Sequence, residues 1–488
     1  MTSADGETWR FYRRVTGPVF SERIHHAVWD ESTNQARLMM QSWLPSSDPE
    51  ADSVPIPSFG DDALRLGLNV ITGAAYGSPL GWDENPPCAT STALSYHDSM
   101  EQLTERLMSL FLTPHWLLRL APRDSTWGRA WEAYSAFGGY IRGMLDRERA
   151  HMNAGDKTEE NLLTALIRAE SMAEKDSRIM NPQEVMGNAF IFLFAGHETT
   201  ANTLHYALIQ LAQRPDIQQF LLDEVDELYE RAAQEGRHEL EYELDFNRGR
   251  WAFAILVRKS TLLQTLLCLT SFSQPQSETL RMYSPAGVTN KWSAADQPIT
   301  FEGRIYAIPQ GTRISINGTG VHANPKVWGD NAREWEPSRW IVEGGDCNLA
   351  LTPQTSREPS PAPRTSRYSP PPSPGAPLLS PTTAQQQSRP SLSRSSSITS
   401  TSSSSTKGLL KPAKGTFLAF SEGSRACSGK KFATVKFAAV LFALFRNHRV
   451  ELEEGWSVER VRTILKGRKA GALTLQPPEA VPLRFIKR

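Results

Sequence analysis

The segment FSEGSRACSG, residues 420–429, places one cysteine, Cys427, among small residues just before an apolar run. That run, KKFATVKFAAVLFALFRNH, predicts a helix, so Cys427 would face the unpaired N–H groups and the positive dipole of a helix N-terminus. This setting favours the thiolate, which is the form of cysteine that binds metals. Gly423 and Gly429 would let the backbone turn sharply and let a flat ligand lie against it.

Two other side chains of this segment would complete a ligand loop. Phe420 can cover the sulfur and exclude water, and Arg425 offers a forked donor for a carboxylate such as a haem propionate. The alternative is a buried structural cysteine, which is the usual role of a single cysteine. Because so many neighbouring positions suit an iron–thiolate ligand, we predict that role for Cys427.

A second candidate is AGHETT, residues 195–200, inside a strongly apolar helical segment. Ala195 and Gly196 would leave room for a ligand against the helix face. The hydroxyl of Thr199 can bond back into the helix and loosen one turn, although such back-bonding is often harmless. The His-Glu pair could suggest zinc, but no second histidine follows at helical spacing, so we set a zinc site aside.

Two charged patterns have spacings that a site could use. Glu278 and Arg281, in ETLRMYSPA, lie one helical turn apart and therefore share a face. Trp9 and Arg13 are likewise separated by one turn of a predicted helix. Each pattern is common on exposed helices, so each gains weight only from its position relative to the other motifs.

The order of these motifs along the chain resembles that of the cytochrome P450 family, and the cysteine loop is the most specific match. The resemblance covers essentially the whole chain apart from two segments described below. It implies a haem b cofactor with Cys427 as the iron ligand. The residues implied to contact the cofactor are Trp9, Arg13, Ala195, Gly196, Phe420, Gly423, Arg425 and Gly429.

The resemblance also implies roles away from the iron. Glu198 and Thr199 would be the acid–alcohol pair that relays protons to bound dioxygen. Arg339, in the second arginine segment WGDNAREWEPSRW, would join Glu278 and Arg281 in a structural cluster behind the haem pocket. Removing one member would leave a buried charge unpaired, at a cost of about 3–5 kcal/mol.

The function implied is that of a haem-thiolate monooxygenase, which inserts one oxygen atom of O2 into a hydrophobic small molecule. The implied electron donor is an NADPH-dependent flavoprotein reductase, and Lys430 and Lys431 with Arg425 are candidates for its docking face. One alternative is a haem-thiolate isomerase or dehydratase that uses no dioxygen; such enzymes often lose the acid–alcohol pair. The other is a truncated, non-catalytic relic of the family.

The elements that must position these residues are mostly helical. The sequence predicts a mainly α protein with minor β, and the resemblance implies the cytochrome P450 fold, with a long central helix over the haem. Helical spacing of apolar residues covers 98–150 and 159–173. In contrast, FEGRIYAIPQGTRISI, residues 301–316, alternates as a half-buried hairpin would, with PQG as its turn.

The central helix has explicit start and stop signals. Asn181 and Glu184 predict a capping box, and Pro182 suits the first helical position. Pro215 ends this helix and opens the next. Because its residues are apolar nearly all round, we expect it to run through the centre of the protein.

The amino terminus differs from the family pattern. Family members begin well before the helix of Trp9 and Arg13, with a membrane anchor in eukaryotes and early strands, so we expect a chain truncated at the amino terminus. MTSADGETWRFYRR contains no apolar stretch of signal-peptide or membrane-span length. The resemblance implies the endoplasmic reticulum membrane as the location of an intact member.

Two internal segments also differ from that pattern. Residues 257–274, VRKSTLLQTLLCLTSFSQ, stand where the family has no insert, and our hypothesis is a retained intron translated in frame. Residues 350–414 are rich in Pro, Ser and Thr and predict a disordered insert, with a partner-binding segment as the alternative. The P450 domain would then comprise residues 1–349 and 415–488.

The bulk composition excludes several other classes of protein. The chain has 53 basic and 53 acidic residues, so no excess of positive charge favours a nucleic-acid partner. Its four cysteines are far apart and form no CxxC pair, which argues against a disulfide scaffold or a zinc module.

Overall fold

The structure is a computed structural model, and it describes residues 4–44, 52–155, 160–171, 178–246, 248, 278–343, 407–409, 412–467, 469–470 and 474–488. The segment 257–274 lies outside the described residues, so the retained-intron hypothesis remains a hypothesis. Most of the predicted insert, residues 350–406 and 410–411, also lies outside them.

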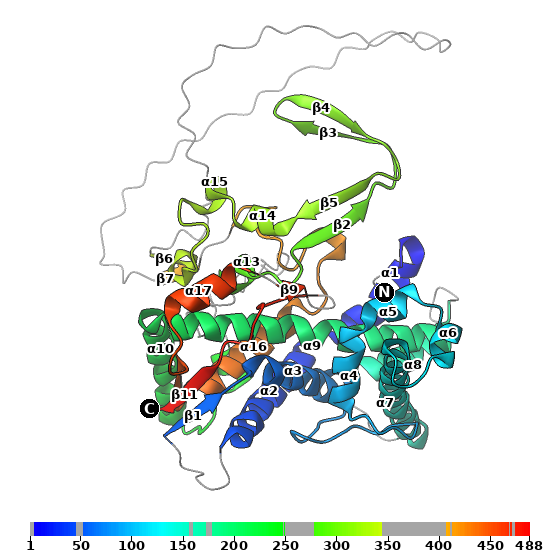
Figure 1. Cartoon of the computed structure of the whole chain (residues 1–488), viewed down its shortest axis with the longest axis horizontal. Helices are drawn as coiled ribbons and strands as arrows, with labels where there is room; N and C mark the ends of the chain where they lie inside the picture. Colours follow the sequence, from blue (N-terminus) through cyan, green and yellow to red (C-terminus); the bar gives the residue numbers. More distant parts are fainter. Residues whose placement is uncertain are drawn as a thin grey trace, which may run out of the picture.

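Helices form most of the fold, which confirms the prediction of a mainly α protein with minor β (Figure 1). Their bounds are α1 (Gly6–Thr16), α2 (Glu22–Trp43), α3 (Phe59–Tyr76), α4 (Tyr96–Glu105), α5 (Leu107–Leu112), α6 (His115–Leu120), α7 (Thr126–Ala154), α8 (Leu162–Ser171), α9 (Pro182–Gln213), α10 (Pro215–Gln234), α11 (Tyr242–Asp245), α13 (Glu278–Met282), α14 (Gly318–His322), α15 (Pro325–Trp328), α16 (Lys430–Phe445) and α17 (Val458–Lys466).

The strands are short and form small antiparallel sheets. Their bounds are β1 (Ser53–Ile56), β2 (Val288–Trp292), β3 (Gln297–Phe301), β4 (Arg304–Ile308), β5 (Arg313–Asn317), β6 (Ile341–Glu343), β7 (Lys407–Leu409), β8 (His448–Leu452), β9 (Lys469–Ala470), β10 (Leu475–Gln476) and β11 (Leu483–Lys487).

Helix α9 crosses the middle of the molecule, as its composition predicted (Figure 1). Its capping box is present, because the Asn181 side chain accepts a hydrogen bond from the Glu184 N–H and the Glu184 side chain accepts one from the Asn181 N–H. Pro215 begins α10, also as predicted. Nearly every residue from Thr200 to Gln213 is buried, so this half of α9 is the centre of the core.

Helices α2, α3 and α16 pack together on one side of α9, and α3 and α9 make an extensive contact. This contact depends on glycine at close approach. A Cβ atom on Gly67 of α3 would lie 2.8 Å from the carbonyl oxygen of His197, and one on Gly196 would lie 2.4 Å from Cδ1 of Ile71. A larger residue at position 67 would push against the backbone of α9, whereas one at position 196 would require the Ile71 side chain to move.

The helical region predicted over 98–150 is divided into four helices. Pro114 precedes α6 and has no N–H to continue a helix. Ser125 caps α7 by accepting a hydrogen bond from the N–H of Gly128. The prediction over 159–173 corresponds to α8.

The predicted hairpin over 301–316 is wrong in its pairing. Strands β4 and β5 flank PQG but do not pair with each other; β4 pairs with β3 and β5 with β2. The turn of the real hairpin is Glu302–Gly303, where both residues have positive φ. Such a two-residue turn matches the twist of the strands, and this favours pairing of β3 with β4. Of the two strands in the predicted segment, β4 is mostly exposed rather than half-buried, whereas exposed and partly buried residues alternate in β5.

The end of the predicted disordered insert differs from expectation. Residues 407–409 form β7, which pairs with β6, so this part of the segment belongs to a sheet. Elsewhere, β1, β11 and β8 form a three-stranded sheet that joins distant parts of the chain. Among the described residues, no helix combines the length and apolar character needed to cross a bilayer.

Candidate functional site

The cysteine loop is closed by its own backbone. The N–H of Cys427 donates to the carbonyl of Phe420 at 2.9 Å, and that of Ala426 donates to the carbonyl of Gly423 at 3.0 Å. Gly423 has φ of +79°, a left-handed conformation that strongly favours glycine. The loop therefore delivers Cys427 three residues ahead of α16, as the sequence predicted.

The thiol of Cys427 has an unusual environment. Its side chain is accessible, yet the surrounding protein raises the pKa of the thiol by burial. The N–H of Gly429 and the charges of Arg13 and Lys430 act in the opposite direction on this pKa. The thiol is therefore accessible although much of the protein surrounds it, and the positive charge nearby favours its thiolate.

Helix α1 lies beside the cysteine loop although 400 residues of sequence separate them. Arg13 donates a hydrogen bond to the hydroxyl of Ser428. The guanidinium of Arg425 lies 4.4 Å from the ring centroid of Trp9 and donates to the Asp5 carboxylate at 2.7 Å. The structure thus brings together the three residues predicted to bind propionates; their role remains a prediction.

The AGHETT motif of α9, residues 195–200, has some of the predicted features but not all of them. The side chain of Ala195 is exposed in the middle of a central helix, so neighbouring side chains do not cover it. Thr199 donates to the carbonyl of Ala195 at 3.0 Å, as predicted. The predicted loosening of one turn is absent, because this bond reaches the carbonyl four residues earlier, which an α-helix accommodates. Gly196 faces Ile71 of α3, so its small size serves helix packing.

Glu198 is buried and turned toward the C-terminal strands. Its Oε1 accepts hydrogen bonds from the hydroxyl of Thr474 at 2.5 Å and the amide of Gln476 at 3.2 Å. Asn202 in turn donates to Thr474 at 2.7 Å. Burial raises the pKa of Glu198, and the bonds from Thr474 and Gln476 act against that rise. Thr199 uses a different partner, so the two members of the predicted acid–alcohol pair are held separately.

Sequence analysis missed Thr474, Gln476 and Asn202. Thr474 and Gln476 lie more than 270 positions from Glu198, and no local pattern links them to it. A second signal was visible but not used: Lys436 interrupts an apolar helix. Its ammonium donates to the carbonyl of Gly196 at 2.9 Å.

The accessible residues of α9 and of the cysteine loop fit a flat prosthetic group with an iron–thiolate bond. Ala195 and Cys427 are accessible although they belong to the interior. A Cβ atom on Gly423 would meet no atom within 4 Å, and one on Gly429 would only touch the Phe20 ring at 4.0 Å, so the loop borders open space. Oε2 of Glu198 is buried without a hydrogen-bond partner in the described part of the chain.

The predicted cluster of Glu278, Arg281 and Arg339 is assembled. Arg281 donates two hydrogen bonds of 2.7 Å to the two oxygens of Glu278, and Arg339 donates to Oε1 of Glu278 at 3.0 Å. The indole of Trp340 adds a bond of 2.9 Å to Oε2. The side chains of Glu278 and Arg281 are fully buried, so the carboxylate depends on these donors.

The lysines proposed for reductase docking already have partners. Lys431 is bound to both carboxylate oxygens of Glu22, at 2.5 and 2.6 Å. The ammonium of Lys430 lies 5.7 Å from the ring centroid of Phe420, and burial lowers its pKa to about 8. These side chains are thus engaged within the protein, and their role in docking remains a prediction.

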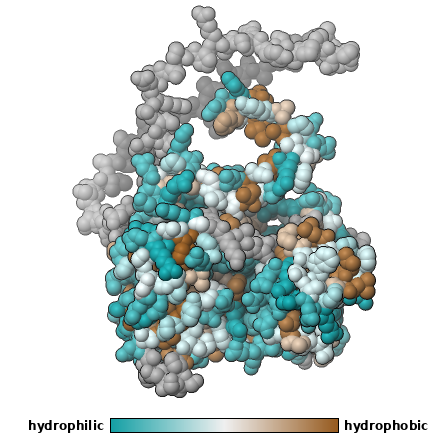
Figure 2. Space-filling view, viewed as in Figure 1, coloured by the Kyte–Doolittle hydropathy of each residue, from teal (hydrophilic) through white to brown (hydrophobic). Residues whose placement is uncertain are grey.

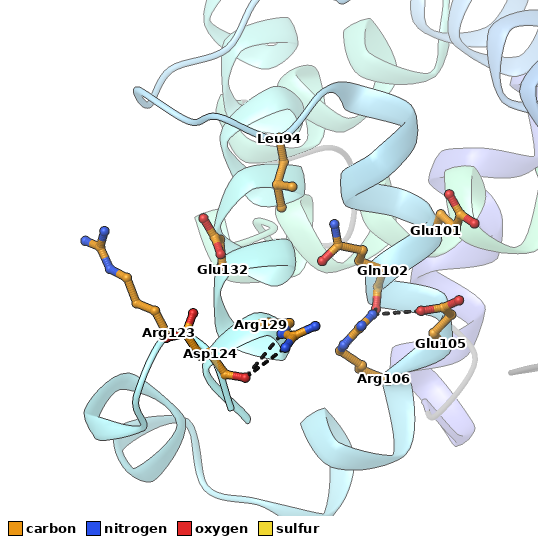
Figure 3. Close-up of a pocket in the computed structure, with 9 residues that line it drawn as sticks. All are labelled: Leu94, Glu101, Gln102, Glu105, Arg106, Arg123, Asp124, Arg129 and Glu132. Atoms are coloured by element: carbon orange, nitrogen blue, oxygen red, sulfur yellow. Dashed lines mark hydrogen bonds and ion pairs between the residues drawn. The ribbon is translucent and has the colours of Figure 1, made fainter. Parts of the chain in front are cut away.

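A separate pocket of about 580 Å³ lies between α4 and α7 (Figure 3). Arg129 donates to the carbonyl of Asp124 on its floor, and Arg106 pairs with Glu105 on the opposite wall. Leu94 is its one apolar lining residue; the others are charged or amide side chains. It contains none of the predicted site residues, and its polar lining does not suit a hydrophobic ligand.

Comparison with known proteins gives consistent matches over the chain. The family model described as Cytochrome P450 matches residues 1–243, 274–357 and 405–479. A cytochrome P450 monooxygenase of Penicillium roqueforti is 26% identical over 100% of this chain and 74% of its own length. Another, from Arthrobotrys oligospora, is 27% identical over 92% of this chain and 68% of its own.

A solved structure also matches the fold of this chain. A crystal structure of a cytochrome P450, CYP102L1, superposes with a TM-score of 0.63 at 16% identity, covering 99% of this chain and 83% of the other. This similarity confirms the fold predicted from the motifs.

Proposed function

Because the chain belongs to the cytochrome P450 family and is a monooxygenase, we propose that it oxidises a hydrophobic small molecule with O2 and haem b held by Cys427. P450 monooxygenases in general take electrons from a redox partner; here we propose an NADPH-dependent flavoprotein reductase. The observation that carries the proposal is the accessible thiol of Cys427 at the head of α16.

The haem and the residues of the chain would have separate roles in the reaction. A haem bound through a thiolate supplies the activation of dioxygen and the transfer of one oxygen atom. Cys427 would hold the iron, and the N–H of Gly429 and the charge of Arg13 would stabilise its thiolate. Trp9, Arg13 and Arg425 would hold the propionates, with Arg425 exchanging its bond to Asp5 for a propionate.

Two residues of α9 would form a proton relay. Burial raises the pKa of Glu198, which favours its protonated form, and Oε2, which has no partner among the described residues, is the atom that would carry the proton. The hydroxyl of Thr199, now bonded to the carbonyl of Ala195, would pass that proton toward the proposed haem site. Buried surroundings would keep bulk water from competing with this relay.

The substrate class follows from the apolar part of α9. Phe190 and Phe192 are only partly buried ahead of the accessible Ala195. Phe192 packs against Phe20 with a centroid distance of 5.7 Å, and Phe190 stacks on Phe194 at 5.4 Å. These rings would favour an apolar molecule through burial of its surface.

We also propose that the protein works at the endoplasmic reticulum membrane. An apolar patch on α5 and α6 supports contact with a membrane surface, and Figure 2 shows brown surface gathered on this part of the molecule. The exposed side chains that form this α5–α6 patch are Met108, Phe111, Leu112, Trp116 and Leu120.

The test is the carbon monoxide difference spectrum of the dithionite-reduced protein, beside a Cys427→Ser variant. The proposal predicts the red-shifted Soret band of thiolate-ligated haem, lost in the variant. Mass spectrometry of the extracted porphyrin then identifies haem b. Absence of the band from a folded wild-type protein would contradict the proposal.

A further inference from the structure

Lys436 lies in the middle of α16, whose other residues from Val435 to Phe445 are almost all apolar and buried. The Lys436 side chain is itself fully buried. An ammonium group removed from water loses several kcal/mol of hydration unless it gains a partner. This burial lowers the pKa of Lys436 to about 7. The group that Nζ contacts therefore bears on why a lysine is found at this buried position.

The partner of Lys436 is a backbone carbonyl in the α9 motif. Nζ donates to the carbonyl oxygen of Gly196 at 2.9 Å. Helix α16 begins three residues after Cys427, so this bond joins the helix that follows the ligand loop to the AGHETT turn of α9. A neutral carbonyl compensates an ammonium less than a carboxylate would, so the bond is not explained by stability alone.

Three carbonyls of this short stretch of α9 accept hydrogen bonds from side chains. Ala195 accepts from Thr199, Gly196 from Lys436, and the carbonyl of Thr199 accepts from Thr203 at 2.8 Å. These donors satisfy carbonyls of a helix that remains continuous through this stretch. Two of these donors belong to α9, whereas Lys436 comes from another helix and can fix the stretch relative to the cysteine loop.

The same turn of α9 also packs closely against α3. Gly196 packs against the terminal methyl of Ile71, and the carbonyl of His197 packs so closely against Gly67 that an added methyl group there would clash with it. The turn therefore contacts both α3 and the ammonium of Lys436. A small displacement of this turn would move Ala195, Glu198 and Thr199 together.

We propose that Lys436 is a positioning residue, which sets the place of the α9 turn over the cysteine loop by holding the carbonyl of Gly196. The inference rests on the proposed role of that turn in catalysis. A positioning role and a purely structural role predict different effects of substitution on stability. Replacing a buried charge by an apolar side chain of similar shape often leaves stability unchanged or raises it. Positioning would then be lost without a loss of stability.

The experiment compares hydrogen–deuterium exchange of the full-length, haem-loaded protein with that of Lys436→Met. Met keeps the length of the side chain but cannot donate. Peptides covering 195–203 should exchange at least about tenfold faster in the variant, since tenfold corresponds to only ~1.4 kcal/mol of local opening. The thermal midpoint should be equal to or higher than that of wild type. Val440→Ala, a fully buried apolar truncation on the same helix, is the control and should lower the midpoint without this local change.

Unchanged exchange over 195–203 in Lys436→Met would overturn the proposal. So would failure of both Lys436→Met and Lys436→Leu to fold when Val440→Ala folds, because Lys436 would then be required for the fold itself. If the wild-type protein binds no haem, the proposed function fails, but the same comparison on the haem-free protein still decides the role of Lys436.

Discussion

The hydroxyl of Thr474 donates a hydrogen bond of 2.5 Å to Oε1 of Glu198. The segment that ends in β10 therefore holds the acidic side chain of the central helix from the other end of the sequence. With Oε1 occupied and Oε2 buried without a partner among the described residues, any proton of Glu198 would be on Oε2. The orientation of this acid is set by Thr474 and Gln476 rather than by its neighbour Thr199.

Glu198→Gln should test the proton relay. The amide keeps the size of the side chain and can still accept from Thr474, but it cannot release a proton. We expect product formation with a reductase to fall by about 10²-fold or more, with the carbon monoxide spectrum unchanged. A variant with wild-type turnover would exclude Glu198 from proton transfer.

Thr474→Val should shift the pH dependence of turnover. The bond from Thr474 lowers the pKa of Glu198, so its removal should raise that pKa further. If protonated Glu198 is the active form, activity falls as pH rises through this pKa, and the alkaline limb of the profile should move to higher pH. A profile identical to that of wild type would show that Thr474 has no influence on the acid.

Arg281→Leu should destabilise the protein strongly. It would remove both short bonds to Glu278 and leave that buried carboxylate with too few donors. We expect a loss of about 3–5 kcal/mol in the free energy of urea unfolding. The exposed pair Arg231–Glu227 is the control, and Arg231→Leu should change that free energy by less than about 1 kcal/mol. Equal effects of the two variants would contradict a buried role for the cluster.

The free energy of unfolding should fall steeply below pH 6.5 because several histidines are buried in neutral form. Burial lowers the pKa of His197 and His205 to about 4, from 6.5 in the unfolded chain. Between these values the unfolded chain binds more protons, so stability is lost as pH falls from 6.5 toward 4. His205→Leu should reduce the slope of unfolding free energy against pH by about 1.4 kcal/mol per unit within this window. An unchanged slope would mean that His205 is protonated in the folded protein.

The sequence predicted those parts of the fold and site that have local signals. The ends of α9 followed from Asn181, Glu184 and Pro215, since capping and the missing N–H of proline act within one helical turn. The cysteine loop followed from side-chain types within ten residues. The pairing of β4 was mispredicted because its alternation is compatible with either neighbour, and the turn at Glu302–Gly303 decides between them.

Contacts between distant segments could not be predicted in this way. Thr474 and Glu198 meet only when the chain is folded, and neither has a neighbour in sequence that reveals the other. Gly196 was assigned to the ligand side because small residues suit both ligand approach and helix packing; the direction of its missing Cβ, toward Ile71, requires the packing of α3. Long-range geometry, rather than residue type, separates these two roles.

The α5–α6 patch should carry membrane association of this chain. Phe111, Leu112 and Trp116 are 72%, 78% and 65% exposed, and burial of such side chains in a lipid surface is favourable. The triple variant Phe111→Ser/Leu112→Ser/Trp116→Ser should reduce binding to phosphatidylcholine–phosphatidylserine vesicles in flotation by at least about tenfold, because the three removed contacts are each worth more than ~1 kcal/mol.

The β3–β4 hairpin provides the matched control for this measurement. Ile299, Phe301 and Ile305 are also exposed, so replacing all three by Ser removes comparable apolar surface from another part of the molecule. If the α5–α6 patch is the membrane contact, the hairpin variant should float as wild type does. An equal loss of vesicle binding in both variants would indicate that binding depends on total apolar surface. A loss of binding in the hairpin variant alone would indicate that β3 and β4 form the membrane contact.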